Sequence, residues 1–261
     1  MPMKRKPPIV LTLSGHDPTG GAGIQADIET AARLGCYPCS VITALTVQDT
    51  HNVRKVLPQK AEDFLEQART VLEDLPVAAI KIGLLGSVDI AYAVHELLKI
   101  AGDIPVVLDP ILAAGGGTNL AGGALIEALR QTLIPRATVL TPNSPEARKL
   151  TGMKDLDGCA RDLLNLGCPN ILLTGTHEDD NEVINRLYRA SGTKTYRWPR
   201  LAGSYHGSGC TLASAVAALL ACGLDIEPAA SKAQEFTWHA LNYGFRLGGG
   251  QLLPNRFYLR P

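Results

Sequence analysis

The sequence lacks an excess of charge of either sign. Its 261 residues include 25 Lys and Arg and 25 Asp and Glu, so the formal net charge is zero. A balanced charge produces no overall field that would attract a polyanion or an anionic lipid surface. We therefore expect no nucleic-acid partner.

Long hydrophobic runs are also absent. The longest apolar stretch, residues 213–223, contains a serine and falls far short of the roughly 20 residues that a membrane-spanning helix needs. The basic residues 4–6 precede only a short apolar run at residues 9–13, which is typical of a strand and not of a signal-peptide core. We therefore expect no membrane partner and a cytoplasmic location.

A second C-x-x-C pair is missing as well. Cys36 and Cys39 have the spacing of a redox pair or of half a zinc site, but no other such pair completes that site. Six cysteines without a secretory signal indicate reduced thiols in a cytoplasmic setting. We interpret Cys36 and Cys39 as buried structural thiols.

The sequence does contain a regular alternation of short apolar strands and amphipathic helices. Apolar, β-branched runs occur at residues 9–13, 39–43, 79–82, 105–108, 138–140 and 171–173. Helical periodicity is found at residues 24–34, 61–75, 88–101, 124–133, 155–166, 210–222 and 227–247. Fully apolar strands that alternate with helices predict a mainly parallel sheet covered on both faces, a three-layer α/β/α fold.

One segment departs from this alternation. Residues 183–197 are more polar and surround Ser191-Gly192, which predicts a β-hairpin at an antiparallel edge of the sheet. No internal repeat, low-complexity tract or long linker divides the chain. We therefore expect a single domain over residues 1–261.

A glycine-rich turn precedes the alanine-rich helix predicted at residue 210. Gly207, Ser208 and Gly209 lead into Cys210, and free N–H groups at a helix start form an anion site suited to a phosphoryl group. A helix start also lowers the pKa of a thiol, so Cys210 is a candidate base. Taken alone, the turn is more typical of a connector beside a buried cysteine.

A second glycine cluster follows the first strand. Residues 20–23 read GGAG, which lacks the G-x-G-x-x-G spacing of a dinucleotide site and argues against a dinucleotide-dependent oxidoreductase. Asp27 lies on the first turn of the next helix. Its carboxylate either faces a ligand at the end of the strand or serves as a capping charge.

Asn143 and Glu146 follow another predicted strand. Their spacing is that of a capping box. The same spacing places both side chains on one side of the first helical turn, where they can hold hydrated Mg²⁺ beside nucleotide phosphates. The sequence leaves both interpretations open.

Six blocks, in order along nearly the whole chain, resemble the hydroxymethylpyrimidine/phosphomethylpyrimidine kinases of the ribokinase superfamily. They read SGHDPTGGAGIQAD at residues 14–27, SVITALTVQ at 40–48, KIGLL at 81–85, LDP at 108–110, TPNSPE at 141–146 and HGSGCTL at 206–212. The resemblance implies a ribokinase-like fold, ATP and Mg²⁺ as cofactors, a homodimer, and a role in thiamin diphosphate biosynthesis.

The resemblance also implies roles for individual residues. The anion hole is formed by residues 207–210, with Cys210 where most ribokinase relatives have an aspartate base. Asn143 and Glu146 hold the metal, in part through water. The substrate-binding residues are Gln48, Asp27, Gly15, Leu84 and Ile111, and the nucleotide side adds Thr174, Gly175 and Asp109. Gln48 is expected to read a ring nitrogen and the exocyclic amine of the pyrimidine.

Three segments depart from the family pattern. Residues 113–118 read AAGGGT where relatives commonly carry a lysine and a serine, so we expect the second phosphorylation to be slower, with Lys81 or Arg256 as candidates for a compensating cation. His16 replaces a small residue, and the segment at 249–257 only partly matches the family ending. The alternative functions are a pyridoxal or pyridoxine kinase and a non-catalytic pyrimidine-binding sensor.

Overall fold

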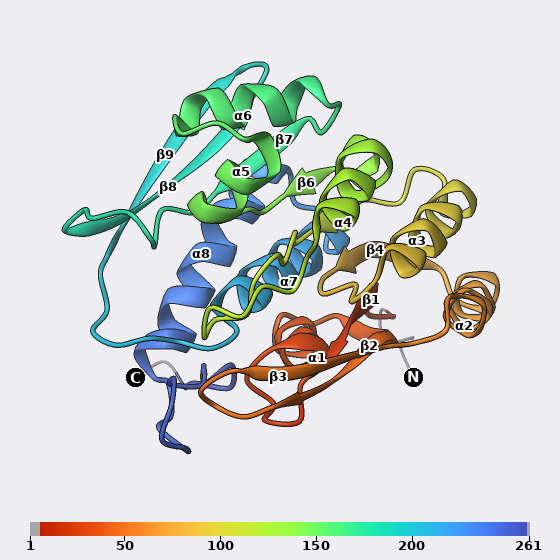
Figure 1. The fold of residues 1–261 in the computed structure, drawn as a ribbon, viewed down its shortest axis with the longest axis horizontal. Coiled ribbons are helices and arrows are strands. Elements are labelled where there is room, and N and C mark those ends of the chain that lie inside the picture. Colours follow the sequence, from red (N-terminus) through yellow and green to blue (C-terminus); the bar gives the residue numbers. More distant parts are fainter. Residues whose placement is uncertain (1–5, 260–261) are drawn as a thin grey trace, which may run out of the picture.

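A nine-stranded sheet runs through residues 6–259, the part of the chain that the computed structural model describes (Figure 1). The strand order is β3-β2-β1-β4-β5-β6-β7-β8-β9. The strands are β1 (Ile9–His16), β2 (Tyr37–Gln48), β3 (Val53–Pro58), β4 (Val77–Ile82), β5 (Val106–Leu108), β6 (Val139–Leu140), β7 (Asn170–Leu173), β8 (Glu182–Arg189) and β9 (Gly192–Pro199). Strands β2, β1, β4, β5, β6 and β7 are parallel, which confirms the predicted sheet.

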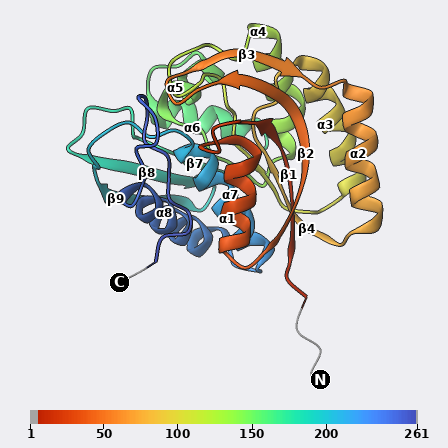
Figure 2. The same cartoon turned by 90° about the horizontal axis from the view of Figure 1, so that it is seen from below.

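Helices cover both faces of this sheet. They are α1 (Gly23–Arg33), α2 (Ala61–Asp74), α3 (Val88–Ala101), α4 (Gly123–Ala128), α5 (Ser144–Thr151), α6 (Leu156–Asn165), α7 (Ser208–Ala221) and α8 (Ile226–Asn242), with a short π-helix (Leu129–Leu133) and a 3₁₀ turn (Ile134–Arg136) after α4. Figure 2 shows α1, α7 and α8 grouped together, away from α2 and α3. The three-layer α/β/α fold is therefore confirmed.

The buried residues of the central strands pack into one of two cores. Leu11 and Leu13 of β1 pack with α2–α6, whereas Val10 packs with α1, α7 and α8. Alternate side chains of a strand point to opposite faces, so a strand buried on both faces must be apolar at consecutive positions. This requirement explains the continuous apolar runs in the sequence.

Both edges of the sheet are antiparallel. The hairpin β8–β9 pairs Arg189 with Gly192 and lies antiparallel to β7, as predicted. At the other edge, β2 continues to Gln48 and pairs antiparallel with β3, a ribbon that the sequence analysis did not predict. This extension carries Gln48 beyond the parallel part of the sheet to the mouth of the cavity described below.

The cysteine pair is not a disulfide. Cys36 is buried and Cys39 half-buried, and both are free thiols. The nearest sulfur to Cys36 is that of Cys222, at 3.7 Å, and burial raises the pKa of Cys36 to about 12. No helix within residues 6–259 is long and apolar enough to cross a membrane. The basic residues Lys4 and Arg5 lie outside the described residues.

Candidate active site

A cavity of about 980 Å³ opens at the carboxyl ends of the parallel strands. Its walls come from the loops after β1, β4, β5 and β6 and from the start of α7. In open α/β sheets this edge is the usual position of a ligand. Most of the predicted site residues line it together: Gly15, Gln48, Leu84, Asp109, Ile111, Asn143, Glu146, Thr174, Gly207, Ser208, Gly209 and Cys210. Asp27 and Gly175 do not.

The start of α7 forms the cradle that the glycine turn predicted. Gly207 is the N-cap and has φ +83°, and a Cβ on it would overlap the carbonyl oxygen of Gly21. Only glycine fits such a backbone at low cost. No side chain within the described part of the chain caps the helix, so the N–H groups of its first turn remain available to an anion.

Arg256 holds this cradle against the loop after β1. Its buried guanidinium donates to Thr211 Oγ1 in α7 at 3.0 Å, and to the carbonyl oxygens of Gly20, at 3.3 Å, and Gly21. A fourth contact joins it to Glu29 Oε2 at 3.0 Å. The two glycine clusters of the sequence are therefore adjacent in space, joined by one arginine.

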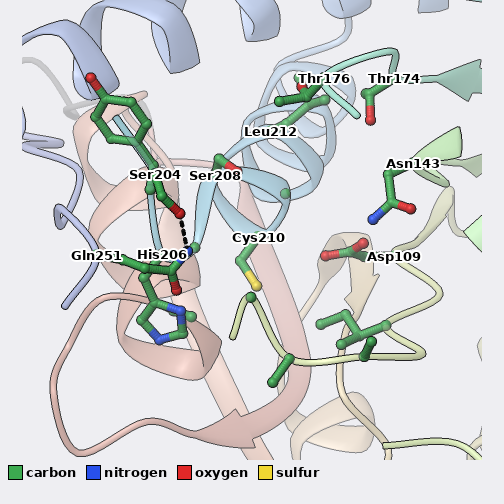
Figure 3. A pocket seen from close by; sticks show the side chains of 18 of the residues that line it. Asp109, Asn143, Thr174, Thr176, Ser204, His206, Ser208, Cys210, Leu212 and Gln251 are labelled. Carbon is green, nitrogen blue, oxygen red and sulfur yellow. Dashed lines mark hydrogen bonds between the residues drawn. The ribbon is translucent and has the colours of Figure 1, made fainter. Parts of the chain in front are cut away.

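Cys210 lies in the first turn of α7 and points into the cavity (Figure 3). Burial raises the pKa of its thiol to about 12, because the nearby positive charge of Lys81 is outweighed by burial and by the negative charges of Asp109 and Asp27. The prediction that the helix start favours the thiolate is therefore wrong. Cys210 is a protonated thiol at neutral pH.

Asp109 lies close enough to Cys210 for each group to affect the pKa of the other. Burial raises the pKa of Asp109 to about 6, although the charge of Lys81 opposes this shift. Its Oδ2 atom is buried and has no hydrogen-bond partner among the described residues. A buried acceptor without a partner costs free energy, so this oxygen is suited to a group that a ligand brings.

Asp27 is not a wall residue, contrary to the prediction. It is fully buried, its Oδ1 lies 2.8 Å from Lys81 Nζ, and it accepts hydrogen bonds from Ser14 and Ser214, each at 2.6 Å. A charge buried this deeply needs such partners, and they occupy both carboxylate oxygens. Asp27 therefore joins α1 to Lys81 of β4 and Ser214 of α7 beneath the cavity floor and does not line the cavity itself.

Asn143 and Glu146 form the capping box that their spacing predicted. Asn143 Oδ1 accepts from the Glu146 N–H at 2.8 Å, and Glu146 Oε2 accepts from the Asn143 N–H at 2.9 Å, which is a complete capping box. Both residues also line the cavity. Burial, followed by the negative charge of Asp109, raises the pKa of Glu146 to about 8.

Gly175 also lies off the cavity wall. Its N–H donates to Asn185 Oδ1 at 3.0 Å, and a Cβ would overlap the carbonyl oxygen of Ile184. The residue packs against β8, while its neighbour Thr174 faces the cavity (Figure 3). Gly175 therefore shapes the turn that brings Thr174 to the cavity.

The cations that we expected to compensate for the glycine segment do not reach the cavity. Lys81 is fully buried on Asp27, and Arg256 is engaged in the loop contacts above. The Lys and Arg residues that line the described cavity are Lys149 and Arg200. Arg200 donates to main-chain carbonyls, whereas Lys149 Nζ contacts two neutral acceptors, Asn119 Oδ1 at 2.5 Å and a carbonyl.

Several wall residues were not singled out from the sequence. Asp17 and His206 are paired at 2.8 Å beside Gln48, and both stood in the family blocks without a role. Gln251 donates to Ser204 Oγ at 2.7 Å (Figure 3). A charged residue directly after a strand and a histidine directly before a glycine turn were the signals available in the sequence.

Within the described residues, no cluster of three or more His, Cys, Asp or Glu side chains could hold a metal ion. The arrangement instead joins an anion cradle to an oxygen-lined wall across the carboxyl edge of a parallel sheet. It is the arrangement of a small-molecule kinase with a ribokinase-like fold.

Comparison with known proteins agrees with this class. The family described as phosphomethylpyrimidine kinase matches residues 17–255. The hydroxymethylpyrimidine/phosphomethylpyrimidine kinase of Streptomyces coelicolor is 40% identical over 250 residues, 94% of this chain and 92% of the relative. The thiamine biosynthesis bifunctional protein ThiED of Geobacter sulfurreducens is 37% identical, over 92% of this chain and 50% of the relative. The chain therefore belongs to the phosphomethylpyrimidine kinase family.

Two solved structures share the fold. The Bacillus subtilis pyridoxal kinase in its ADP complex has a TM-score of 0.90 at 30% identity, covering 96% of this chain and 98% of that one. The Clostridium difficile phosphomethylpyrimidine kinase has a TM-score of 0.78 at 35% identity, covering 88% and 97%. Phosphomethylpyrimidine and pyridoxal kinases thus share this architecture.

Proposed function

We propose that this enzyme transfers the γ-phosphoryl group of ATP to the hydroxymethyl oxygen of 4-amino-5-hydroxymethyl-2-methylpyrimidine, and then phosphorylates the monophosphate, in thiamin diphosphate biosynthesis. The cradle at residues 207–210, facing Asp109 and the capped Asn143–Glu146 pair, carries the proposal. Phosphoryl transfer needs little beyond positioning and charge stabilisation, and the cradle supplies backbone donors for the transferring group.

The oxygen donors on the Asn143–Glu146 wall suit Mg²⁺. A carboxylate and an amide oxygen are hard ligands, and Mg²⁺ usually takes one or two carboxylates together with phosphate and water oxygens. When bound, Mg²⁺ neutralises charge on the phosphates. Glu146 must release its proton to act as a ligand, and its raised pKa of about 8 makes this step depend on pH. Thr174 borders the same part of the cavity on the nucleotide side.

Cys210 and Asp109 provide a path for the proton of the hydroxymethyl group. The thiol is protonated, so it accepts the substrate proton only as it passes its own proton to the neighbouring Asp109 carboxylate. In a loose transition state the oxygen loses its proton late. The sulfur is therefore a relay in this proposal, and Asp109 is the final acceptor.

Lys149 is the cation that we propose for the second transfer. The acceptor is then a phosphate monoester with close to two negative charges, and like charges repel strongly at short range. Lys149 lies on α5, three residues beyond Glu146, and its present acceptors are neutral. Among residues 6–259, its ammonium group thus contacts no carboxylate, so it would not have to give up an ion pair in order to bind a phosphate.

The remaining proposals concern the whole protein. We propose one kinase domain over residues 1–261, a homodimer and a cytoplasmic location, on the basis of the family and of the continuous sheet. The pyrimidine is preferred to pyridoxal as the substrate because the family and the most similar curated relatives carry the pyrimidine name. A non-catalytic sensor would not need both the anion cradle at residues 207–210 and the Asn143–Glu146 capping box on the cavity wall.

One assay tests the proposal. Purified enzyme is incubated with Mg-ATP and, in parallel, with the hydroxymethylpyrimidine, its synthetic monophosphate or pyridoxal, and the products are separated by mass. We expect the pyrimidine monophosphate and then the diphosphate. If pyridoxal is phosphorylated and the pyrimidine is not, the enzyme is a pyridoxal kinase. If none of the alcohols gives a product, the result would support the non-catalytic sensor.

A further inference from the structure

Asp17 is a nearly buried carboxylate surrounded by hydrogen-bond donors. Its oxygens accept from the N–H and hydroxyl of Thr19, each at 2.8 Å to Oδ1, and from the N–H of Ala22 at 2.8 Å. His206 Nε2 lies 2.8 Å from Oδ2, and Gln48 Nε2 lies 3.4 Å from that same histidine nitrogen, which brings the amide near the carboxylate. Burial would raise the pKa of Asp17, but the hydrogen bonds from His206, Gln48 and Thr19 outweigh it and place the pKa well below the usual range.

An ionised carboxylate can only accept hydrogen bonds. The atom that Gln48 presents to Asp17 must therefore be its NH₂ group, and the His206 nitrogen at Oδ2 must carry the proton. The 3.4 Å separation between Gln48 Nε2 and His206 Nε2 is then a contact between two donors that share one acceptor. This assignment follows from charge and does not depend on which way the amide is drawn.

The other end of the amide faces the ligand. Gln48 lines the cavity, and with its nitrogen held at Asp17 its Oε1 is the acceptor left for a ligand. The second N–H of the same NH₂ group remains free to donate. Gln48 thus presents an acceptor and a donor side by side.

We propose that Asp17 is a positioning residue that locks the Gln48 amide in one orientation and so selects an aminopyrimidine edge over an oxo-pyrimidine edge. The inference deepens the proposed function and rests on it. A 4-amino group donates and the adjacent ring nitrogen accepts, which matches the locked amide. A 4-oxo ring reverses both roles, and matching it would turn Oε1 of Gln48 against the Asp17 carboxylate.

The test compares the affinity of two ligands for each of three proteins by calorimetry. The ligands are the 4-amino alcohol and its 4-oxo analogue. The proteins are the wild type, Asp17→Asn and the matched control Thr19→Ala, which loses a donor to the same carboxylate but leaves the Gln48 contact. We expect the wild type to prefer the amino ligand by about 30-fold, since a mismatched buried pair typically costs ~1–3 kcal/mol.

Asp17→Asn can offer its own NH₂ to a reversed Gln48, so the preference should fall about tenfold or more, whereas Thr19→Ala should keep it. An unchanged preference in Asp17→Asn, or an equal loss of both ligands, overturns the positioning role while leaving the proposed function intact. A wild type that binds neither ligand refutes the proposed function and the inference with it.

A second measurement covers the case in which Asp17→Asn does not fold. In ¹⁵N spectra of the wild type, the side-chain NH₂ of Gln48 should exchange with solvent at least tenfold more slowly than that of Gln67, which is exposed on α2. Protection by a buried carboxylate predicts this difference. Equal exchange rates overturn the proposal.

Discussion

Lys81 Nζ lies 2.8 Å from Asp27 Oδ1, and both side chains are fully excluded from solvent. Ser214 of α7 donates to the same carboxylate, so this ion pair joins β4, α1 and α7 below the cavity. A buried ion pair is costly to break from one side, because the remaining charge has no partner and no water.

Lys81→Met should therefore lower the free energy of unfolding by about 3–5 kcal/mol, measured from the urea midpoint. The double variant Lys81→Met with Asp27→Leu removes both charges and should recover much of that loss, because an apolar pair of similar volume replaces the ion pair. A single variant as stable as the wild type would show that the pair does not hold the site together.

Cys210→Ala should reduce turnover by about a hundredfold or more, in the range typical of a lost proton-transfer group. The fold and pyrimidine binding should remain, because the change removes one sulfur atom from the cavity wall. Steady-state kcat and calorimetric binding measure the two effects, and Cys222→Ser, at the far end of α7, is the matched control. Near-normal turnover in Cys210→Ala would make the assignment wrong.

The titration of Asp109, the proposed proton acceptor, should appear in the pH dependence of kcat. Asp109 has a pKa of about 6, and the protonated acid cannot accept the proton that Cys210 passes on. We expect kcat to fall as the pH drops through about 6. Asp109→Asn should reduce kcat at every pH and abolish this inflection, and an inflection that survives the substitution would assign it to another group.

Glu146 should make stability depend on pH in the opposite sense to an ordinary paired carboxylate. Its pKa rises from 4.5 to about 8 on folding, so the folded chain holds this proton more tightly. The stabilising contribution is complete below about pH 4.5 and is lost as the pH rises through about 8. Unfolding free energies from pH 5 to 9 should decline less steeply in Glu146→Gln than in the wild type or in Glu66→Gln, an exposed control on α2.

The second phosphorylation should be slower than the first and should depend on Lys149. We expect Lys149→Gln to lower the kcat/KM of the monophosphate about tenfold, the effect of one lost charge-assisted hydrogen bond, with the unphosphorylated alcohol within about twofold. Lys154→Gln, an exposed lysine just beyond α5, should change neither. Equal losses for both acceptors would place Lys149 on the nucleotide instead, and a wild type that makes the diphosphate as fast as the monophosphate would show that the glycine segment does not impair this step.

The parts of the fold that were predicted are those specified by residues close together in the sequence. β7 and the β8–β9 hairpin follow from consecutive apolar residues and from Ser191-Gly192. β3 was missed because it is an edge strand that carries Arg54 and Lys55, and charged residues at an edge, which limit pairing with other chains, resemble a loop in sequence.

The same distinction separates the predicted site residues that lie on the cavity wall from those that do not. The cradle at residues 207–210 was predictable because a glycine turn and a helix start are adjacent in sequence. The role of Asp27 was not, because its partners Lys81 and Ser214 come from positions 54 and 187 residues away. The prediction of a lowered pKa for Cys210 was wrong for a related reason. Burial depends on the whole fold, and here it raises the pKa of the thiol by more than the helix start lowers it.

Arg256 ties the cradle to the glycine loop after β1, and it does so from the carboxyl-terminal end of the fold. Chains fold from the amino terminus as they are synthesised, so a ribosome that has reached residue 250 has already made β1, α7 and nearly every residue of the cavity wall. The two glycine loops still lack the guanidinium that joins them. On a growing chain, the two glycine loops therefore stay unjoined until Arg256 has been added and can reach them, well after most of the cavity wall has been made.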